Sequence, residues 1–357
     1  MKTKSHQNGG KKPVTMRDVA RESGVSPMTV SRVLSGSQTV DPELRQRVLS
    51  IAERLDYVPN MLASNLASNR TEFIGVATPF RDLVGTTFFR EVLAGFQSVT
   101  ERNKLDFALF DCASERFNDP RELAAIYRQK KAGGLLIVAP QMHGRYLRTL
   151  AGMGVAFVVV GEYIDDEEVP SISCDDTMGI KLAVEHLLGL GHRDIAYIGG
   201  PPMLGSGKRR ESAFTTAMAA ANIEVPAHFL QPGDYTIISG HESAQFLLTS
   251  KRRHPTAIVA ANDISAIGVI EAARDLGLRV PEDLSVTGFD DLSPAHEHGL
   301  FLTTLHQPVM EIGTVAAKML LKSIENGEPL NGHVDVDVAL VVRSSTGPAA
   351  TRMSVVS

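Results

Sequence analysis

The stretch VTMRDVARESGVSPMTVSRVLSG, residues Val14–Gly36, predicts two short helices separated by a tight turn. Thr15 has the residue type and the position of an N-cap for the first helix. Gly24 can adopt the left-handed conformation that ends a helix. Ser26 is then placed to cap a second helix that has Pro27 as its first residue, where the missing N–H costs little.

A third helix is predicted from Asp41 to about Tyr57, before Pro59. Its apolar residues recur at helical spacing: Leu44, Val48, Ile51, Ala52 and Leu55. Three short helices around one small core, with a glycine turn between the first two, are typical of a helix-turn-helix domain. The alternative is a structural helical hairpin whose polar face is only solvated.

The outward face of the second helix has the side chains that a DNA major groove requires. Arg32 can donate two hydrogen bonds to a guanine edge. Pro27 and Met28 offer apolar contact to a thymine methyl, and hydroxyl groups on the same face can reach phosphates. The predicted DNA contacts of this domain are Thr15, Ser26, Pro27, Met28, Thr29, Ser31 and Arg32.

The charge of the chain is distributed unevenly. The 357 residues carry a net charge of −5. Residues 1–60 contain ten Lys and Arg against six Asp and Glu, a balance of +4, so the remaining residues carry 26 against 35, a balance of −9. A basic head on an acidic body favours a polyanion-binding module attached to a second function. The alternative is an ordinary scatter of surface charge.

The composition is that of a cytoplasmic globular protein. Hydrophobic residues make up 43% of the chain, which is enough for a sizeable core. No apolar run of about 18 residues exists, so no membrane span is expected. The basic N-terminus lacks the apolar segment of a secretory signal and is interpreted as a flexible arm. Cys112 and Cys174 are too few for a disulfide framework, so we expect a reduced, cytoplasmic setting.

Motifs of catalysis and cofactor binding fail on inspection. The segment IGGPPMLGSGKRR resembles a phosphate-binding loop, but Pro202 stands where glycine is required and Arg209 where a hydroxyl would hold magnesium. His186 has no second histidine at metal-ligand spacing. We therefore predict no catalytic residue, no metal and no cofactor. The alternatives are a solute-binding protein for transport, which would need a signal peptide, and a sugar-metabolising enzyme, which would need a catalytic constellation.

From Phe73 onward, short strands of buried type alternate with helix-length segments. The strands are FIGVATP, DFALFD, GGLLIVAP, VAFVVVG, DIAYIGG, TAIVAAN and LSVTGFDD. The helical segments are Phe89–Arg102, Pro120–Lys131, Ile180–Gly189, Ser239–Ser250 and Ile264–Leu276. This alternation predicts an α/β fold with two doubly wound lobes, divided at about residue 162. Ligands bind such sheets beyond the carboxyl ends of the strands.

Polar side chains stand where several of these strands are predicted to end, and Arg210 stands at a predicted helix start. Arginine, amide and carboxylate groups can together hydrogen-bond several hydroxyls or a carboxylate. Phe88 offers an apolar face for a sugar ring. The candidate effector contacts are Phe88, Arg210, Asn262, Asp263, Asp290 and Gln307. The alternative for each is a cap or a solvated side chain, and Asp263 is equally well explained as a cap or hinge residue.

The order and spacing of DVA, GVS, TVSRVL, YVPN and IGV resemble the N-terminus of the lactose/galactose repressor (LacI/GalR) family of bacterial transcription regulators. Further similar segments, among them VEHLLGLGHRDIAYIGGP and VVRSSTGP, extend the resemblance to about Gly347. It implies a core similar to periplasmic sugar-binding proteins, with Arg210, Asn262, Asp290 and Gln307 at effector-contacting positions. One departure is that Glu162 is the nearest acid to a position where many members carry Asp.

The resemblance also implies a mechanism. The segment PNMLASNLASNR, residues 59–70, would form a paired hinge helix, with Leu66 inserted into the minor groove and Asn60 and Ala63 beside it. A homodimer would bind a pseudo-palindromic operator. A sugar or sugar acid between the lobes would shift their orientation and so change DNA affinity. The expected protein is a repressor of carbohydrate genes in the bacterial cytoplasm, associated with the nucleoid. Its dimer contacts are expected from Phe89–Arg102 and the segment after Gly313.

The expected domains, in chain order, are a basic arm (1–13), a helix-turn-helix domain (14–59), a hinge helix or linker (60–71), an effector-binding core (72–347) and a tail (348–357). Within the core, the first lobe is expected to comprise residues 72–162 and 292–322, and the second lobe residues 163–291 and 323–347.

Overall fold

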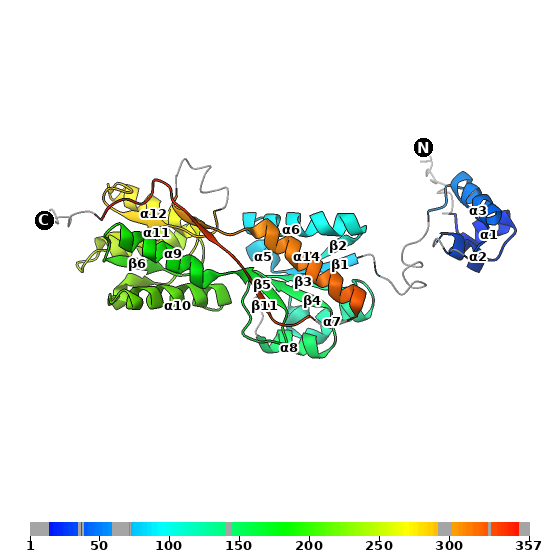
Figure 1. Cartoon of the computed structure of the whole chain (residues 1–357), viewed down its shortest axis with the longest axis horizontal. Coiled ribbons are helices and arrows are strands. Elements are labelled where there is room, and N and C mark those ends of the chain that lie inside the picture. The colour runs from blue at the N-terminus through cyan, green and yellow to red at the C-terminus, as the bar shows by residue number, and fades with distance from the viewer. Residues whose placement is uncertain are drawn as a thin grey trace, which may run out of the picture. The chain divides into compact units, whose positions relative to one another are not determined.

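The structure is a computed structural model, and it describes residues 14–34, 37, 39–58, 71, 73–139, 144–291, 302–327 and 330–349. Its contacts divide the chain into two compact units, residues 1–71 and 72–357 (Figure 1). Within the described residues, no helix is both long enough and apolar enough to span a membrane. The predicted DNA contacts Asn60, Ala63 and Leu66 lie outside the described residues.

The first unit, here called the headpiece, contains the three predicted helices, α1 (Met16–Ser23), α2 (Pro27–Leu34) and α3 (Pro42–Arg54). Gly24 ends α1 with a φ of 68°, the left-handed conformation that the turn requires. The Asp41 carboxylate starts α3 by accepting hydrogen bonds from the backbone N–H groups of Glu43 and Leu44, at 3.0 and 3.1 Å. The shared core is Val19, Ala20, Val30, Val33, Val48 and Ala52. The helix-turn-helix prediction is therefore confirmed.

The first sheet of the core is six-stranded and parallel, with strand order β11-β5-β4-β3-β1-β2. Its strands are β1 (Phe73–Thr78), β2 (Asp106–Asp111), β3 (Leu135–Val138), β4 (Phe157–Val160), β5 (Ser171–Cys174) and β11 (His333–Val336). Helices α6 (Thr87–Thr100) and α14 (Val309–Asn326) cover one face, and α7 (Pro120–Arg128) and α8 (Gly144–Gly152) cover the other (Figure 1). The short helices are α5 (Phe80–Leu83), η1 (Glu101–Asn103) and η2 (Glu115–Asn118).

The second sheet is four-stranded and parallel, with order β7-β6-β8-β9. Its strands are β6 (Ile195–Ile198), β7 (Leu230–Gln231), β8 (Ala257–Ala260) and β9 (Ser285–Thr287). Helices α9 (Asp176–Gly189) and α10 (Gly205–Ala220) pack on one face, and α11 (Ile237–Thr249) and α12 (Asp263–Asp275) on the other. A short helix, η3 (Ala227–Phe229), precedes β7, and β10 (Thr304–His306) pairs antiparallel with β12 (Ala339–Val341).

The sheets correct the expected lobe boundaries. The strands β5 and β11 extend the first sheet. The sequence had placed both in the second lobe, which was expected to comprise residues 163–291 and 323–347. Thr303, assigned to the first lobe, forms a parallel bridge with Thr287 at the end of the second sheet. The physical reason is that burial and period identify a strand but do not determine which sheet it joins.

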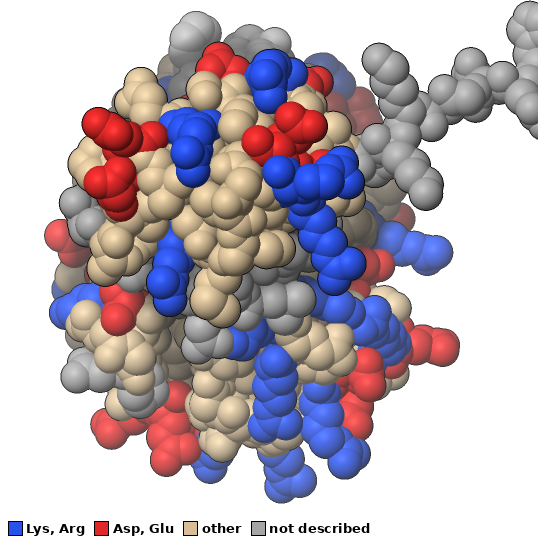
Figure 2. All heavy atoms as spheres, turned by 90° about the vertical axis from the view of Figure 1, so that its right-hand side faces the viewer, with Lys and Arg blue, Asp and Glu red and all other residues tan. Residues whose placement is uncertain are grey.

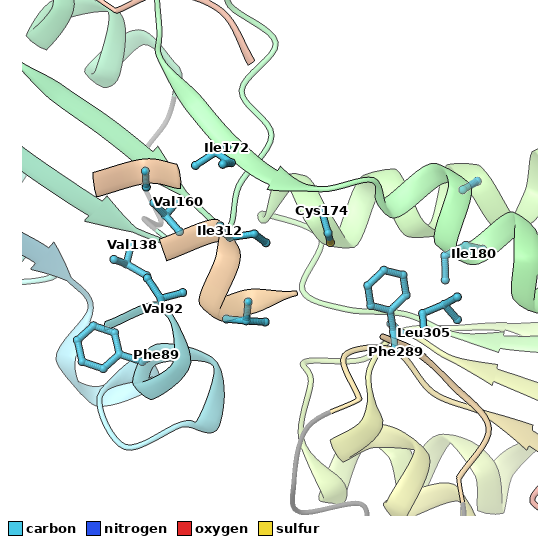
Figure 3. Packing of buried hydrophobic residues seen from close by; sticks show 14 of the residues in the cluster. Phe89, Val92, Val138, Val160, Ile172, Cys174, Ile180, Phe289, Leu305 and Ile312 are labelled. Atoms are coloured by element: carbon cyan, nitrogen blue, oxygen red, sulfur yellow. The ribbon is translucent and has the colours of Figure 1, made fainter. Parts of the chain in front are cut away.

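A buried apolar cluster continues from the first sheet to the second (Figure 3). Val138 and Val160 come from first-sheet strands, and Phe289 comes from the segment after β9. Cys174, at the end of β5, lies between these two groups (Figure 3). The cluster therefore joins both lobes into one compact unit, in agreement with the division of the chain at residue 71.

Candidate functional sites

The exposed face of α2 carries three of the predicted DNA contacts, Pro27, Met28 and Arg32. Val30 and Val33 are buried in the headpiece core, which turns the opposite side of the helix outward. Met28 is 66% exposed on that side. The Ser26 hydroxyl caps the helix by accepting a hydrogen bond from the Thr29 backbone N–H, at 3.1 Å. Local sequence therefore determines both where the helix begins and which face it presents.

The remaining predicted contacts of the headpiece differ in exposure. Pro27 and Arg32 are exposed, whereas Ser31 is half-buried. Thr15 is exposed, and its hydroxyl donates to the Asp18 carboxylate at 2.6 Å. The same carboxylate accepts the backbone N–H of Thr15 at 3.0 Å. These hydrogen bonds hold the pKa of Asp18 below its usual range, so the start of α1 keeps its negative charge.

The basic surplus of the head does not come from the folded helices. Residues 14–58 contain six Arg and six Asp and Glu, a balance of zero; the surplus comes from Lys2, Lys4, Lys11 and Lys12 in the arm, outside the described residues. Within the headpiece, Glu22 pairs with Arg54 at 3.3 Å. Figure 2 shows a face of the molecule on which basic and acidic side chains are interspersed. DNA binding by this domain must therefore depend on how its charges are placed rather than on their sum.

Arg210 is the centre of a buried polar cluster in the core. Its Nε donates to the Asp176 carboxylate at 2.7 Å, and its Nη1 donates to the backbone carbonyl of Ala261 at 2.6 Å. Nη1 also lies 3.6 Å from Oδ1 of Asp290. The guanidinium carbon is 3.7 Å from the centre of the Phe289 ring. A guanidinium buried to this extent requires such partners, because an unpaired buried charge is strongly unfavourable.

Asp290 joins Arg210 to a third predicted effector contact. Gln307 is buried and donates a hydrogen bond from Nε2 to the Asp290 carboxylate at 2.6 Å. Burial raises the pKa of Asp290 to about 6, although Arg210 and Gln307 act in the opposite direction. Asp290 also has a φ of 122°, a conformation that side chains rarely adopt. Backbone strain of this kind is found most often at functional sites.

Asn262 and Asp263 stand at the start of α12 in different environments. The Asn262 side chain caps the helix, accepting the Ser265 N–H at 2.8 Å, and donates to the Tyr235 carbonyl at 3.3 Å. Asp263 is buried and accepts a hydrogen bond from the Thr304 hydroxyl at 2.5 Å. Asp263 therefore ties α12 to β10, which agrees with the alternative of a structural role.

Phe88 lies apart from these hydrogen bonds. It is half-buried at the start of α6 and packs against Gly161, which has a φ of 81°. The next residue, Glu162, is 3% exposed and accepts the backbone N–H groups of Gly205 and Ser206 at 2.7 and 3.3 Å. Burial raises the pKa of Glu162 to about 7, even though these two hydrogen bonds lower it.

Sequence reasoning missed two members of the cluster. Asp176 lies two residues beyond the end of β5, so the strand-end rule that selected Asn262 and Asp290 could also have selected it. Tyr235, whose hydroxyl donates to Ser206 at 3.2 Å, follows a two-residue strand that has no clear signal in the sequence.

The chain combines a helix-turn-helix headpiece with a two-lobed α/β core, and the core buries a polar cluster where strands end. This combination defines a class of DNA-binding regulators with a ligand-binding core. Residues 15–60 match the model of bacterial regulatory proteins, lacI family, and residues 184–346 match a periplasmic binding protein-like domain. The chain belongs to the lacI family of bacterial transcriptional regulators.

Relatives match along nearly the whole chain. Catabolite control protein A of Priestia megaterium is 31% identical, covering 93% of this chain and 99% of its own length. The transcriptional repressor PurR of Serratia proteamaculans is 33% identical, covering 93% and 96%. A solved structure of the lac repressor dimer bound to operator and the anti-inducer ONPF has a TM-score of 0.81 at 28% identity, covering 94% of this chain and all of that chain.

Proposed function

We propose that the protein is a homodimeric repressor that binds a near-palindromic operator and that a small polar effector at the Arg210 cluster controls this binding. The observation that carries the proposal is that the buried Gln307 donates a hydrogen bond to Asp290, just beyond β9, and that Asp290 forms an ion pair with the buried Arg210 at 3.6 Å. The similar lac repressor dimer was solved with both operator and an anti-inducer bound, which supports one protein that binds DNA and a small effector.

The charge of the cluster favours a neutral, hydroxyl-rich effector, such as a sugar, over the sugar acid that the sequence also suggested. The Arg210 guanidinium is already paired with Asp176 and Asp290. Arg81 and Lys208, which could have assisted in holding a carboxylate, are both exposed. A structural neighbour described as a regulator CelR–cellobiose complex, with a TM-score of 0.68, supports a sugar.

The DNA contacts proposed for the headpiece are the exposed face of α2, centred on Arg32, and the hinge residues Asn60, Ala63 and Leu66. A helix in the major groove and a leucine wedge in the minor groove would together define each half-site. The relatives are transcriptional regulators, which supports a protein that acts without catalysis in the cytoplasm.

A thermal-shift screen of the full-length protein against sugars, sugar acids and nucleobases tests the effector site. A ligand present at 100 times its Kd stabilises the folded state by about 2.7 kcal/mol. Gln307→Ala should remove most of this shift, whereas Arg279→Ala, which removes an ion pair with Asp283 elsewhere in the second lobe, should retain it. Equal shifts in wild type and Gln307→Ala would place the effector elsewhere.

A further inference from the structure

The first turn of α10 contacts both lobes. The helix belongs to the second lobe, where it packs against α9. Its first two backbone N–H groups, of Gly205 and Ser206, nevertheless donate to Glu162, which follows strand β4 of the first sheet. The positive end of the α10 dipole is thus covered by a carboxylate of the opposite lobe.

Arg209, one turn further along α10, makes a second set of contacts with the first lobe. Its guanidinium carbon is 4.4 Å from the centre of the Tyr163 ring. Its Nη2 lies 3.3 Å from a carboxylate oxygen of Asp335, on strand β11 of the first sheet. The side chain is only 17% exposed, so its planar group is held between ring and carboxylate rather than free in water.

The partners of Arg209 are themselves held in place. The Tyr163 ring meets the His333 ring edge-on, with centres 4.8 Å apart. His333 contacts the Ser171 hydroxyl through Nδ1 at 2.8 Å and the Asp335 carboxylate through Nε2 at 3.0 Å. A surface ion pair whose partners are fixed by packing loses less side-chain entropy on forming than an isolated pair.

Gly205 allows the close approach of the two lobes. A Cβ at this position would lie 2.8 Å from the Glu162 carboxylate and 2.8 Å from the Tyr163 carbonyl. Any larger residue would push α10 away from the first lobe. The glycine therefore acts at the same contact as Arg209, although it carries no charge.

We propose that the N-terminal end of α10 is a latch that fastens the two lobes together in the absence of effector. Its contacts are Glu162 with the helix start, and Arg209 with Tyr163 and Asp335. None of these contacts is a hydrogen bond or ion pair of Arg210, so the latch adds a cost to lobe rearrangement beyond the contacts of that residue. It thereby sets the resting balance between the lobe arrangements on which an effector acts.

Hydrogen exchange of the full-length, ligand-free protein tests the latch. Asp335→Asn changes a first-sheet residue, yet it should speed exchange of the Gly205 and Ser206 amides in the second lobe by roughly three- to tenfold. Arg209→Met should do the same, and the double variant should exchange no faster than the faster single one. The control is Asp166→Asn, which removes an ion pair with Arg148 within the first lobe and should leave these amides unchanged.

A second pair of variants separates the latch from a local effect of charge. Gly205→Ala should speed the same amides although alanine favours helix formation, whereas Gly189→Ala, where the new methyl meets open space, should not. Unchanged exchange in Asp335→Asn and Gly205→Ala, or effects that simply multiply in the double variant, would overturn the latch. Because no ligand is present, this result does not depend on where the effector binds.

Discussion

At the residue scale, Arg210 illustrates what buried charge requires. Its guanidinium is satisfied by two carboxylates, a carbonyl and an aromatic face drawn from three separate segments. The sequence could indicate Asn262, Asp290 and Gln307 as candidates, because each follows a recognisable strand. It indicated Arg210 through an expected helix start, whereas α10 begins five residues earlier, at Gly205. It could not indicate that Arg210 is already paired, since that pairing exists only after distant segments fold together.

Arg32→Ala should weaken binding to the specific operator by roughly tenfold to a hundredfold, because a bidentate contact to a base contributes about 1–3 kcal/mol. The thermal midpoint should be unchanged, since Arg32 is exposed. Footprinting on an operator selected from random DNA measures the effect. Arg47→Ala, an exposed arginine on α3, is the control and should retain sequence preference. Equal loss of specificity in both variants would remove α2 as the recognition helix.

Glu162 predicts a pH dependence of stability. Burial raises its pKa to about 7, with Asp176 acting in the same direction and Arg210 opposing it. Because the pKa is raised in the folded state, protonated Glu162 favours folding. This contribution to stability is complete below the pKa of the unfolded state and is lost as the pH rises through about 7. Glu162→Gln should therefore be more stable than wild type at pH 8, by up to about 2–3 kcal/mol, and the difference should vanish near pH 4, below the unfolded-state pKa of about 4.5. Urea denaturation measures it, and a constant difference at both pH values would contradict the assignment.

At the element scale, the headpiece helices were predicted closely and the sheet membership of the core was not. Caps and a glycine turn are local signals, so α1, α2 and α3 begin and end near the predicted residues. The strands β5 and β11 were assigned to the opposite lobe from the one they join. Whether a strand pairs with one sheet or another is decided by tertiary contacts, which period and burial do not encode.

The contact between α6 and α14 depends on two glycines. A Cβ on Gly95 or Gly313 would overlap the backbone of the facing helix. Gly313→Ala should therefore destabilise the fold by about 1–3 kcal/mol, although alanine favours a helix by about 1 kcal/mol. Chemical denaturation of the full chain measures this, and Gly189→Ala is the control that should be neutral or stabilising. Stabilisation by Gly313→Ala would show that the helices are not in close contact.

At the scale of the whole molecule, the DNA-binding and ligand-binding functions occupy separate compact units of one chain. Control of one by the other requires that the effector and the operator favour different arrangements of the core. By linkage, the effector changes operator affinity by the same factor as the operator changes effector affinity. A factor different from one distinguishes a regulated repressor from a protein that binds both ligands independently.

The central claim is tested most directly by the operator affinity of the full-length protein with and without the ligand found in the thermal screen. The account predicts a change of roughly 5- to 150-fold, corresponding to about 1–3 kcal/mol of coupling. Gln307→Ala should abolish this change while binding the operator as tightly as ligand-free wild type. A ligand that binds the core yet leaves operator affinity unchanged would contradict the account.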